Sequence, residues 1–342
     1  MKMTPNLSFD DVLIVPQYSD IQSRSEIDIS NDLGKLNLSL PVLSAPMDSV
    51  TESVMATAMA KNGGLGIIHR YNTIQKQVKL AKKSRTPSVA AAVGVTGDYL
   101  DRAVALYNAG VKIICVDVAH GHHVLMRHAL EVLRNTLGTQ VTIIAGNVAT
   151  LQAFNDLSDW GADAVRVGIG GGSICSTRIQ TGHGVPTLQS VLDCAASDRP
   201  AKLIADGGIK NSGDIVKAYA AGADFVMLGS MLAGTTETPG DIRYKQFPGQ
   251  CNPSKIKVYR GMASEDAQKD WRGKSSSVEG VATTIPYKGH VKNVLRSIER
   301  GVKSGFSYSG ARSFAEFQAK AQLIRQTASS QVESSTHIER VN

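Results

Sequence analysis

The sequence has few cysteines, few aromatic residues and no long uncharged apolar run, and each shortage excludes a class of protein. Its 342 residues include four cysteines, which are too few and too scattered for the disulfide framework of a small secreted domain. No two of them form a Cys-x-x-Cys pair that would indicate zinc. No apolar run approaches the roughly 18 residues of a membrane span, and the N-terminus lacks a signal-peptide pattern. We therefore expect a reduced, cytoplasmic protein with no membrane partner.

The charge of the chain is basic but dispersed. Lys and Arg number 37 against 30 Asp and Glu, which gives a net charge of +7. The basic residues form no block of about five to eight and do not alternate with aromatic residues, so nucleic acid is not an expected partner. The surplus of positive charge is compatible with an ordinary solvated surface or with a preference for phosphorylated small molecules.

Eight short apolar runs recur along the chain, each followed by an amphipathic segment. The runs are continuously apolar, which is typical of parallel strands covered on both faces. Several intervening segments, such as 99–108 and 214–220, end in glycine just before the next run, as helices do. Eight such units predict a (β/α)8 TIM barrel, with a doubly wound sheet as the alternative. The expected strands are 41–45, 66–69, 90–95, 112–117, 141–146, 164–168, 202–206 and 224–229.

The residues after the eighth run break this alternation. Residues 235–290 are rich in Gly, Ser, Lys and Pro and show no sustained periodicity, which favours a flap over the barrel. Helical patterns follow at 291–303 and 313–327, and the polar tail 328–342 is expected to be loosely held unless a neighbouring subunit orders it. We assign residues 1–327, flap included, to a single catalytic barrel domain.

Glycine-rich, polar segments follow the seventh and eighth runs, at the face where barrels carry their active sites. Asp206-Gly207-Gly208 and Gly229-Ser230 occupy the position at which barrels commonly bind phosphate through backbone N–H groups. Tight turns are the alternative interpretation. Asp206 suits hydrogen bonds from sugar hydroxyls, although alone it equally suits a helix cap.

The most unusual stretch follows the sixth run and reads Gly168-Ile-Gly-Gly-Gly-Ser-Ile-Cys175-Ser-Thr177-Arg. It lacks the strand-to-helix context of a dinucleotide fingerprint, because Ser-Ile-Cys-Ser-Thr-Arg is not a recognisable helix start. Glycines let the backbone bend around a ligand or a monovalent cation, and the loop delivers a thiol to the active face. We therefore favour a nucleophile at Cys175, whereas Cys115 and Cys194, in a predicted strand and helix, are better read as small buried residues.

Because these motifs occur together and in this order, the sequence resembles the IMP dehydrogenase/GMP reductase family over nearly its whole length except the tail. The family implies a barrel, usually a homotetramer, that binds a purine nucleoside 5′-monophosphate. It also implies a covalent bond between the loop cysteine, here Cys175, and purine C2. The motifs that carry the resemblance are 7–12, 44–50, 146–149, 168–170, 172–178, 181–184, 205–209, 227–234, 259–262 and 287–289.

The resemblance also implies roles for individual residues. Thr177 and Glu279 match the family's Thr–Glu pair, which moves protons during the reaction, and Asp206 matches the residue that holds the ribose. The phosphate contacts match Ser173, Gly208, Gly229, Ser230 and Tyr259, and the base contacts match Gly261 and Met262. Cofactor contacts match Asp117, Asn147 and Ser264, and the carbonyls of a potassium site match Gly170, Gly172 and Cys175.

The flap and the chain length favour the reductase within this family. Dehydrogenases hydrolyse the covalent adduct with an Arg-Tyr pair on the flap, and this chain has none there. Its Met262-Ala-Ser-Glu265 is closer to the reductase's Met-Ser-Ser-Glu. Only residues 73–89 lie where most dehydrogenases insert a tandem CBS regulatory module, so none fits here.

Other motifs favour the dehydrogenase. Residues 45–48, His120-Gly-His122 and the tail motif 333–337 are closer to dehydrogenases, and Gly171 replaces the proline usual in both. Because flap chemistry differs between the two reactions, we weigh it most and predict an NADPH-dependent GMP reductase, with potassium as a possible cofactor. The alternatives are an NAD-dependent IMP dehydrogenase without the CBS module, in which Arg272 would activate water, and, remotely, a non-catalytic nucleotide-binding protein.

Overall fold

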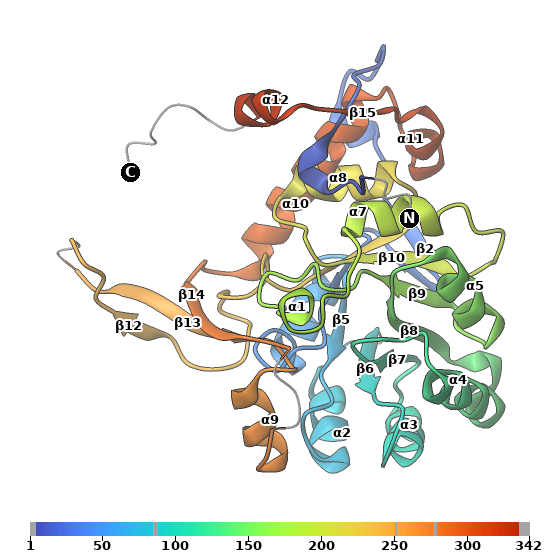
Figure 1. Cartoon of the computed structure of the whole chain (residues 1–342), viewed down its shortest axis with the longest axis vertical. Coiled ribbons are helices and arrows are strands. Elements are labelled where there is room, and N and C mark those ends of the chain that lie inside the picture. Colours follow the sequence, from blue (N-terminus) through green and yellow to red (C-terminus); the bar gives the residue numbers. More distant parts are fainter. Residues whose placement is uncertain (1–4, 85, 87, 250–251, 276–278, 335–342) are drawn as a thin grey trace.

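A computed structural model of the chain describes residues 5–84, 86, 88–249, 252–275 and 279–334. Eight parallel strands close into a barrel in chain order, with the last, β11, pairing with the first, β4 (Figure 1). The predicted (β/α)8 barrel is confirmed, and all eight predicted runs are strands. They are β4 Val42–Ser44, β5 Leu65–Ile68, β6 Val89–Val93, β7 Ile113–Asp117, β8 Thr142–Val148, β9 Ala164–Val167, β10 Lys202–Asp206 and β11 Phe225–Leu228.

Helices follow the barrel strands and cover their outer face. Side-chain caps start several of them: Thr150 accepts a hydrogen bond from Ala153 N–H at 3.3 Å, and Asn211 accepts one from Asp214 N–H at 2.9 Å. Gly110 and Gly222, predicted to end helices, have φ of 97° and 105°. The helices are α1 Ser53–Lys61, α2 Ile74–Lys83, α3 Tyr99–Asn108, α4 Val124–Leu137, α5 Leu151–Asp159, α6 Thr177–Thr181, α7 Thr187–Cys194 and α8 Ser212–Ala220.

The short helix α6 corrects the sequence analysis, which expected no helix start after Cys175. It begins at Thr177, where the Ser176 side chain makes no capping hydrogen bond to the helix backbone, and ends after one turn at Gly182, whose φ is 70°. An uncapped single turn carries neither a capping motif nor an apolar period, so the sequence gives no signal for it.

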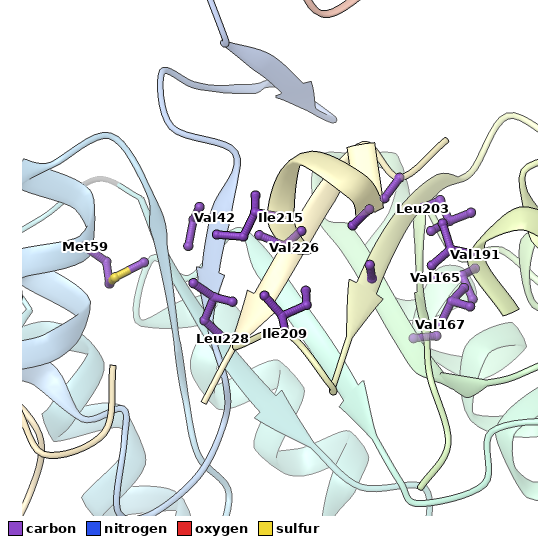
Figure 2. Close-up of a cluster of buried hydrophobic side chains, with 14 of the residues drawn as sticks. Val42, Met59, Val165, Val167, Val191, Leu203, Ile209, Ile215, Val226 and Leu228 are labelled. Carbon is purple, nitrogen blue, oxygen red and sulfur yellow. The ribbon is translucent and has the colours of Figure 1, made fainter. Parts of the chain in front are cut away.

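The core has two layers, separated by the barrel wall. Alternate strand residues such as Leu65, Ile144 and Phe225 fill the barrel interior. The others face outward against the helices, as Figure 2 shows for Val226 beside Ile215 of α8 and for Val165 beside Val191 of α7. Because both faces of every strand are buried, the continuous apolar runs follow directly from the fold.

The flap contains regular structure that its composition did not reveal. It forms a three-stranded antiparallel sheet, β12 Arg243–Lys245, β13 Ser254–Arg260 and β14 Ala282–Pro286, which projects from one side of the barrel (Figure 1). Between β13 and β14 lies helix α9, Glu265–Arg272. Lys257 of β13 is buried and donates to the carbonyl of Thr238 at 2.6 Å, which ties the sheet to the segment after β11.

The C-terminal region differs from its prediction. Helix α10, Val291–Tyr308, extends beyond the predicted 291–303, whereas α11, Phe314–Lys320, is shorter than the predicted 313–327. Helix α11 ends early because the residues after it form β15, Leu323–Arg325, which pairs antiparallel with β1, Val12–Ile14. The first residues of the predicted loose tail form α12, Ala328–Glu333, while 335–342, and with them most of the motif 333–337, lie outside the described residues.

Five further short elements lie within the described residues. Strands β2, Asn31–Leu33, and β3, Leu36–Leu38, form a separate hairpin. Three single 3₁₀ turns are η1 Phe9–Asp11, η2 Arg24–Glu26 and η3 Gly138–Gln140. Within the described residues, no helix has both the length and the apolar character to cross a membrane.

Candidate active site

A cavity of about 230 Å³ lies at the C-terminal ends of the barrel strands, between the Cys175 loop and the flap. It brings together residues that lie far apart in the sequence. Its lining includes every predicted catalytic and nucleotide-binding residue: Ser173, Cys175, Thr177, Asp206, Gly208, Gly229, Ser230, Tyr259, Gly261, Met262 and Glu279. The predicted cofactor residues Asp117, Asn147 and Ser264 are not part of this lining.

The three predicted catalytic residues form a hydrogen-bonded chain. The Cys175 thiol donates to Thr177 Oγ1 over 3.1 Å, and the Thr177 hydroxyl donates to Glu279 Oε2 over 2.9 Å. The direction of these bonds leads from the sulfur to the carboxylate. The arrangement can therefore carry the thiol proton to Glu279 and return it to a group bound beside the sulfur.

The flap backbone holds Glu279 next to the cysteine loop. Ser176 N–H donates to the carbonyl of Glu279 at 3.1 Å, and Val281 N–H donates to the carbonyl of Ile174 at 3.0 Å. Cys175 and Gly280 form a β-bridge between these contacts. Glu279, 102 residues from Thr177 in sequence, is thus positioned by main-chain contacts that no side-chain motif encodes.

One end of the cavity has the character of an anion site. Tyr259 is buried, and its hydroxyl lies 3.5 Å from Ser173 Oγ. Burial raises the pKa of the Tyr259 phenol, so it stays protonated and available as a donor. Lys288 donates to the carbonyl of Ser230, which also lines the cavity, at 2.6 Å. Gly208 is part of the same lining, and its φ of 77° favours glycine.

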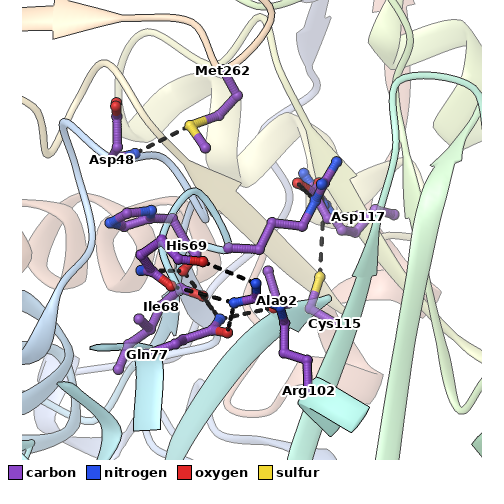
Figure 3. A network of polar contacts seen from close by, with 12 residues as sticks. Asp48, Ile68, His69, Gln77, Ala92, Arg102, Cys115, Asp117 and Met262 are labelled. Carbon is purple, nitrogen blue, oxygen red and sulfur yellow. Dashed lines mark hydrogen bonds and ion pairs between the residues drawn. The ribbon is translucent and has the colours of Figure 1, made fainter. Parts of the chain in front are cut away.

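The other end of the cavity contains Met262, whose sulfur lies 3.2 Å from the backbone nitrogen of Asp48 (Figure 3). Asp48 also accepts a hydrogen bond from Arg260 Nη2 at 2.7 Å. Arg260 N–H in turn donates to Ser49 Oγ at 3.1 Å. The segment that follows β4 therefore fixes the end of β13 and, with it, the predicted base contacts.

A buried arginine that the sequence analysis missed lies beneath the cavity. Arg166 Nη2 donates to Asp206 Oδ2 at 2.8 Å, and its Nη1 pairs with Asp117 Oδ1. Asn147 Nδ2 donates to the same Asp206 oxygen at 2.8 Å. Figure 3 shows Asp117 beside Cys115, whose sulfur lies 3.6 Å from Arg166. The sequence did contain a signal for this cluster, since Arg166 is a charged residue inside the apolar run 164–168. A charge on a strand buried on both faces needs partners of opposite charge.

A second cavity of about 790 Å³ lies beside Asp117, between α2 and the flap helix α9. Trp271 of α9 stacks on Tyr71, with 4.1 Å between ring centroids, and the Arg70 guanidinium lies 5.8 Å from the Trp271 ring. The sequence analysis missed this stack. Only proximity in the fold pairs the two aromatics, so no local pattern could have found it.

Two sets of predicted residues have structural roles in the described chain. The Ser264 hydroxyl is buried and caps α9 by accepting from Ala267 N–H at 3.3 Å, so its contact with a cofactor stays a prediction. The Gly172 carbonyl accepts a hydrogen bond from Cys175 N–H at 3.1 Å. A carbonyl oxygen has a second lone pair, so this bond is compatible with the predicted potassium site, which also stays a prediction.

Comparison with known proteins places this geometry in a family. The profile of the IMP dehydrogenase / GMP reductase domain matches residues 6–337. The inosine-5′-monophosphate dehydrogenase of Nitrosopumilus maritimus is 34% identical, covering 98% of this chain and 99% of its own. The GMP reductase of Leishmania major is 30% identical, covering 97% and 96%. The alignments with both span 480 positions, so these relatives carry segments that the 342-residue chain lacks.

The fold comparison agrees with the sequence comparison. The crystal structure of a GMP reductase variant from Trypanosoma brucei in complex with guanosine 5′-monophosphate superposes with a TM-score of 0.92. It is 30% identical to this chain, and the match covers 99% of both chains. By sequence and by fold, the chain belongs to the IMP dehydrogenase/GMP reductase family of oxidoreductases.

Proposed function

We propose that the chain is an NADPH-dependent GMP reductase, which converts GMP to IMP and ammonia through a covalent bond between Cys175 Sγ and purine C2. The observation that carries the proposal is the hydrogen-bonded chain from Cys175 through Thr177 to Glu279 at the cavity wall. The Trypanosoma brucei reductase, which shares the fold and was solved with guanosine 5′-monophosphate, supports GMP as the ligand.

The relay accounts for the proton movements of deamination. The Cys175 thiol passes its proton through the Thr177 hydroxyl to the Glu279 carboxylate as the sulfur bonds to purine C2. Glu279 then gives this proton to the 2-amino group, which leaves as ammonia when its bond to C2 breaks. NADPH, when bound, supplies the hydride that adds to C2. The sulfur leaves as a thiolate when IMP forms, and it regains a proton from solvent.

The position of Arg272 favours the reductase over the dehydrogenase. Within the described part of the chain, no lysine or arginine lines the nucleotide cavity. Arg272, the flap residue considered for water activation, instead lies over Trp271 at 4.5 Å and lines the second cavity. Hydrolysis of the adduct in the proposed dehydrogenase alternative would need Arg272 beside C2, and in the described part of the chain Arg272 does not line that cavity.

The second cavity suits the phosphates of a dinucleotide cofactor. It adjoins Asp117, whose Oδ2 lies 4.0 Å from Arg70 Nε, and its lining also includes Lys76, Arg102 and Arg272. Two carboxylates, Asp98 and Asp270, also line it, and four cations against two anions leave a positive surplus that favours a polyanionic ligand. Arg70, Lys76 and Arg272 would hold the cofactor phosphates, and Asp117 would face the nicotinamide. A homotetramer stays a prediction from the family resemblance.

Trp271→Ala is expected to raise the KM for NADPH about three- to tenfold, because the lost ring stack is worth roughly 0.5–1.5 kcal/mol. The KM for GMP should change by less than about twofold, since Trp271 does not line the nucleotide cavity. Steady-state kinetics measure both constants. Trp271→Phe, which can still stack on Tyr71, is the matched control and should behave almost as the natural enzyme. Equal increases in the two KM values would contradict a cofactor-side role.

Absorbance at 340 nm in two reactions tests the proposed activity directly. One contains GMP and NADPH, and the other contains IMP, NAD and potassium. The proposal predicts a fall in absorbance in the first and no sustained change in the second. A sustained rise in the second alone would identify a dehydrogenase, and nucleotide binding without change in either would identify a non-catalytic binder.

A further inference from the structure

We propose that Arg166 is a positioning residue that aims the Asp206 carboxylate at the nucleotide ribose and couples it to the cofactor side of the site. Arg166 is only 6% exposed and does not line the nucleotide cavity, so it acts through its partners. The inference rests on the proposed nucleotide site, within which it adds a role for a residue outside the cavity.

The hydrogen bonds to Asp206 fix which of its oxygens faces the ligand. Oδ2 accepts from Arg166 Nη2 at 2.8 Å, from Arg166 Nε at 3.3 Å and from Asn147 Nδ2 at 2.8 Å. The Asn147 amide is itself fixed, because it also donates to the carbonyl of Gly168 at 2.9 Å. With Oδ2 saturated, Oδ1 is the oxygen left for ribose hydroxyls at the cavity wall.

The same guanidinium links two sides of the barrel mouth. Asp206 ends β10, which is adjacent to β9, whereas Asp117 ends β7, two strands away on the other side. A planar guanidinium can hold both carboxylates at once with separate nitrogens, and a lysine ammonium cannot reproduce this fork. Arg70, 4.0 Å from Asp117, adds a second cation, so the cluster balances two positive and two negative charges.

Binding measurements without cofactor distinguish a positioning role of Arg166 from a general loss of structure. The probes are GMP and 2′,3′-dideoxy-GMP, which lacks the hydroxyls that Asp206 would bind, and calorimetry gives the Kd of each. For Arg166→Lys we expect GMP binding to weaken at least about fivefold, in line with loss of a charged hydrogen bond. Binding of the dideoxy nucleotide should change by less than about twofold, because it does not use Asp206.

A second variant keeps the test decisive if Arg166→Lys does not fold. Asp117→Asn removes the negative charge of one of the two carboxylates that anchor Arg166 without touching the nucleotide cavity. It should also weaken binding of GMP more than binding of dideoxy-GMP. In an Asp206→Ala background, Arg166→Lys should cause almost no further loss of GMP affinity.

Several results would overturn the inference. The first is an equal loss of affinity for both nucleotides, and the second is an unchanged GMP affinity in Arg166→Lys. The third is full additivity of the affinity losses caused by Arg166→Lys and Asp206→Ala. The inference also fails if the unsubstituted protein binds GMP and dideoxy-GMP with the same Kd, because Asp206 then makes no contact with the ribose hydroxyls. None of these measurements uses NADPH or turnover, so failure of the reductase activity would be detected separately, in the absorbance assay.

Discussion

Cys175→Ser is expected to abolish both IMP formation and the covalent enzyme–purine adduct. A serine hydroxyl at this position is a far weaker nucleophile than a thiolate near neutral pH, so no bond to purine C2 forms. GMP should still bind within about threefold, because the hydrogen bonds assigned to the phosphate and ribose come from other residues. Acid quenching followed by intact-protein mass spectrometry detects the adduct, and the absorbance assay detects turnover.

The matched control for this variant is Cys194→Ala. Cys194 is buried in α7, and burial raises the pKa of its thiol to about 12, so it is not a thiolate near neutral pH. Its replacement should leave adduct formation unchanged. Appreciable turnover in Cys175→Ser would contradict the covalent mechanism.

Glu279→Gln is expected to lower the rate of ammonia release by at least about 100-fold while GMP binding is retained. General acid–base catalysis typically contributes about 10²–10⁴-fold, and an amide can neither take the thiol proton nor return it to the leaving amine. The glutamine can still accept a hydrogen bond from Thr177, so the loop geometry should survive. Rapid-quench measurement of ammonia, with calorimetry for GMP, separates chemistry from binding.

Two variants of Thr177 test the relay itself. Thr177→Ser keeps the hydroxyl and should retain most of the activity, whereas Thr177→Val keeps the shape but interrupts the path between Cys175 and Glu279. A Glu279→Gln enzyme that releases ammonia at the natural rate would remove Glu279 from the mechanism.

The barrel could be predicted from sequence because each of its strands carries its own signal. Both faces of a barrel strand are buried, so residues 113–116 of β7 and Phe225–Leu228 are apolar without interruption. Where structure depends on partners distant in sequence, prediction failed. The segment Leu323–Arg325 reads as helix and becomes a strand because β1 offers it an edge.

The same distinction between local sequence signals and partners distant in sequence applies to the nucleotide site. Cys175 was predicted as a nucleophile from its glycine-rich loop, and Thr177 and Glu279 were predicted through family motifs. The structure joins the three in a hydrogen-bonded chain. The Tyr71–Trp271 stack was missed because its two rings lie far apart in the sequence and meet only in the fold. Arg166 was missed because its partners on β7 and β10 are neighbours only in the barrel.

The most direct test of the account is the stoichiometry of ammonia release from GMP labelled with ¹⁵N at its 2-amino group. The relay from Cys175 to Glu279, working on a nucleotide that then accepts hydride, predicts one labelled ammonia and one IMP for each NADPH oxidised. NADPH-independent product, or XMP formed from IMP and NAD with no labelled ammonia from GMP, would contradict the assignment of this chain as a reductase.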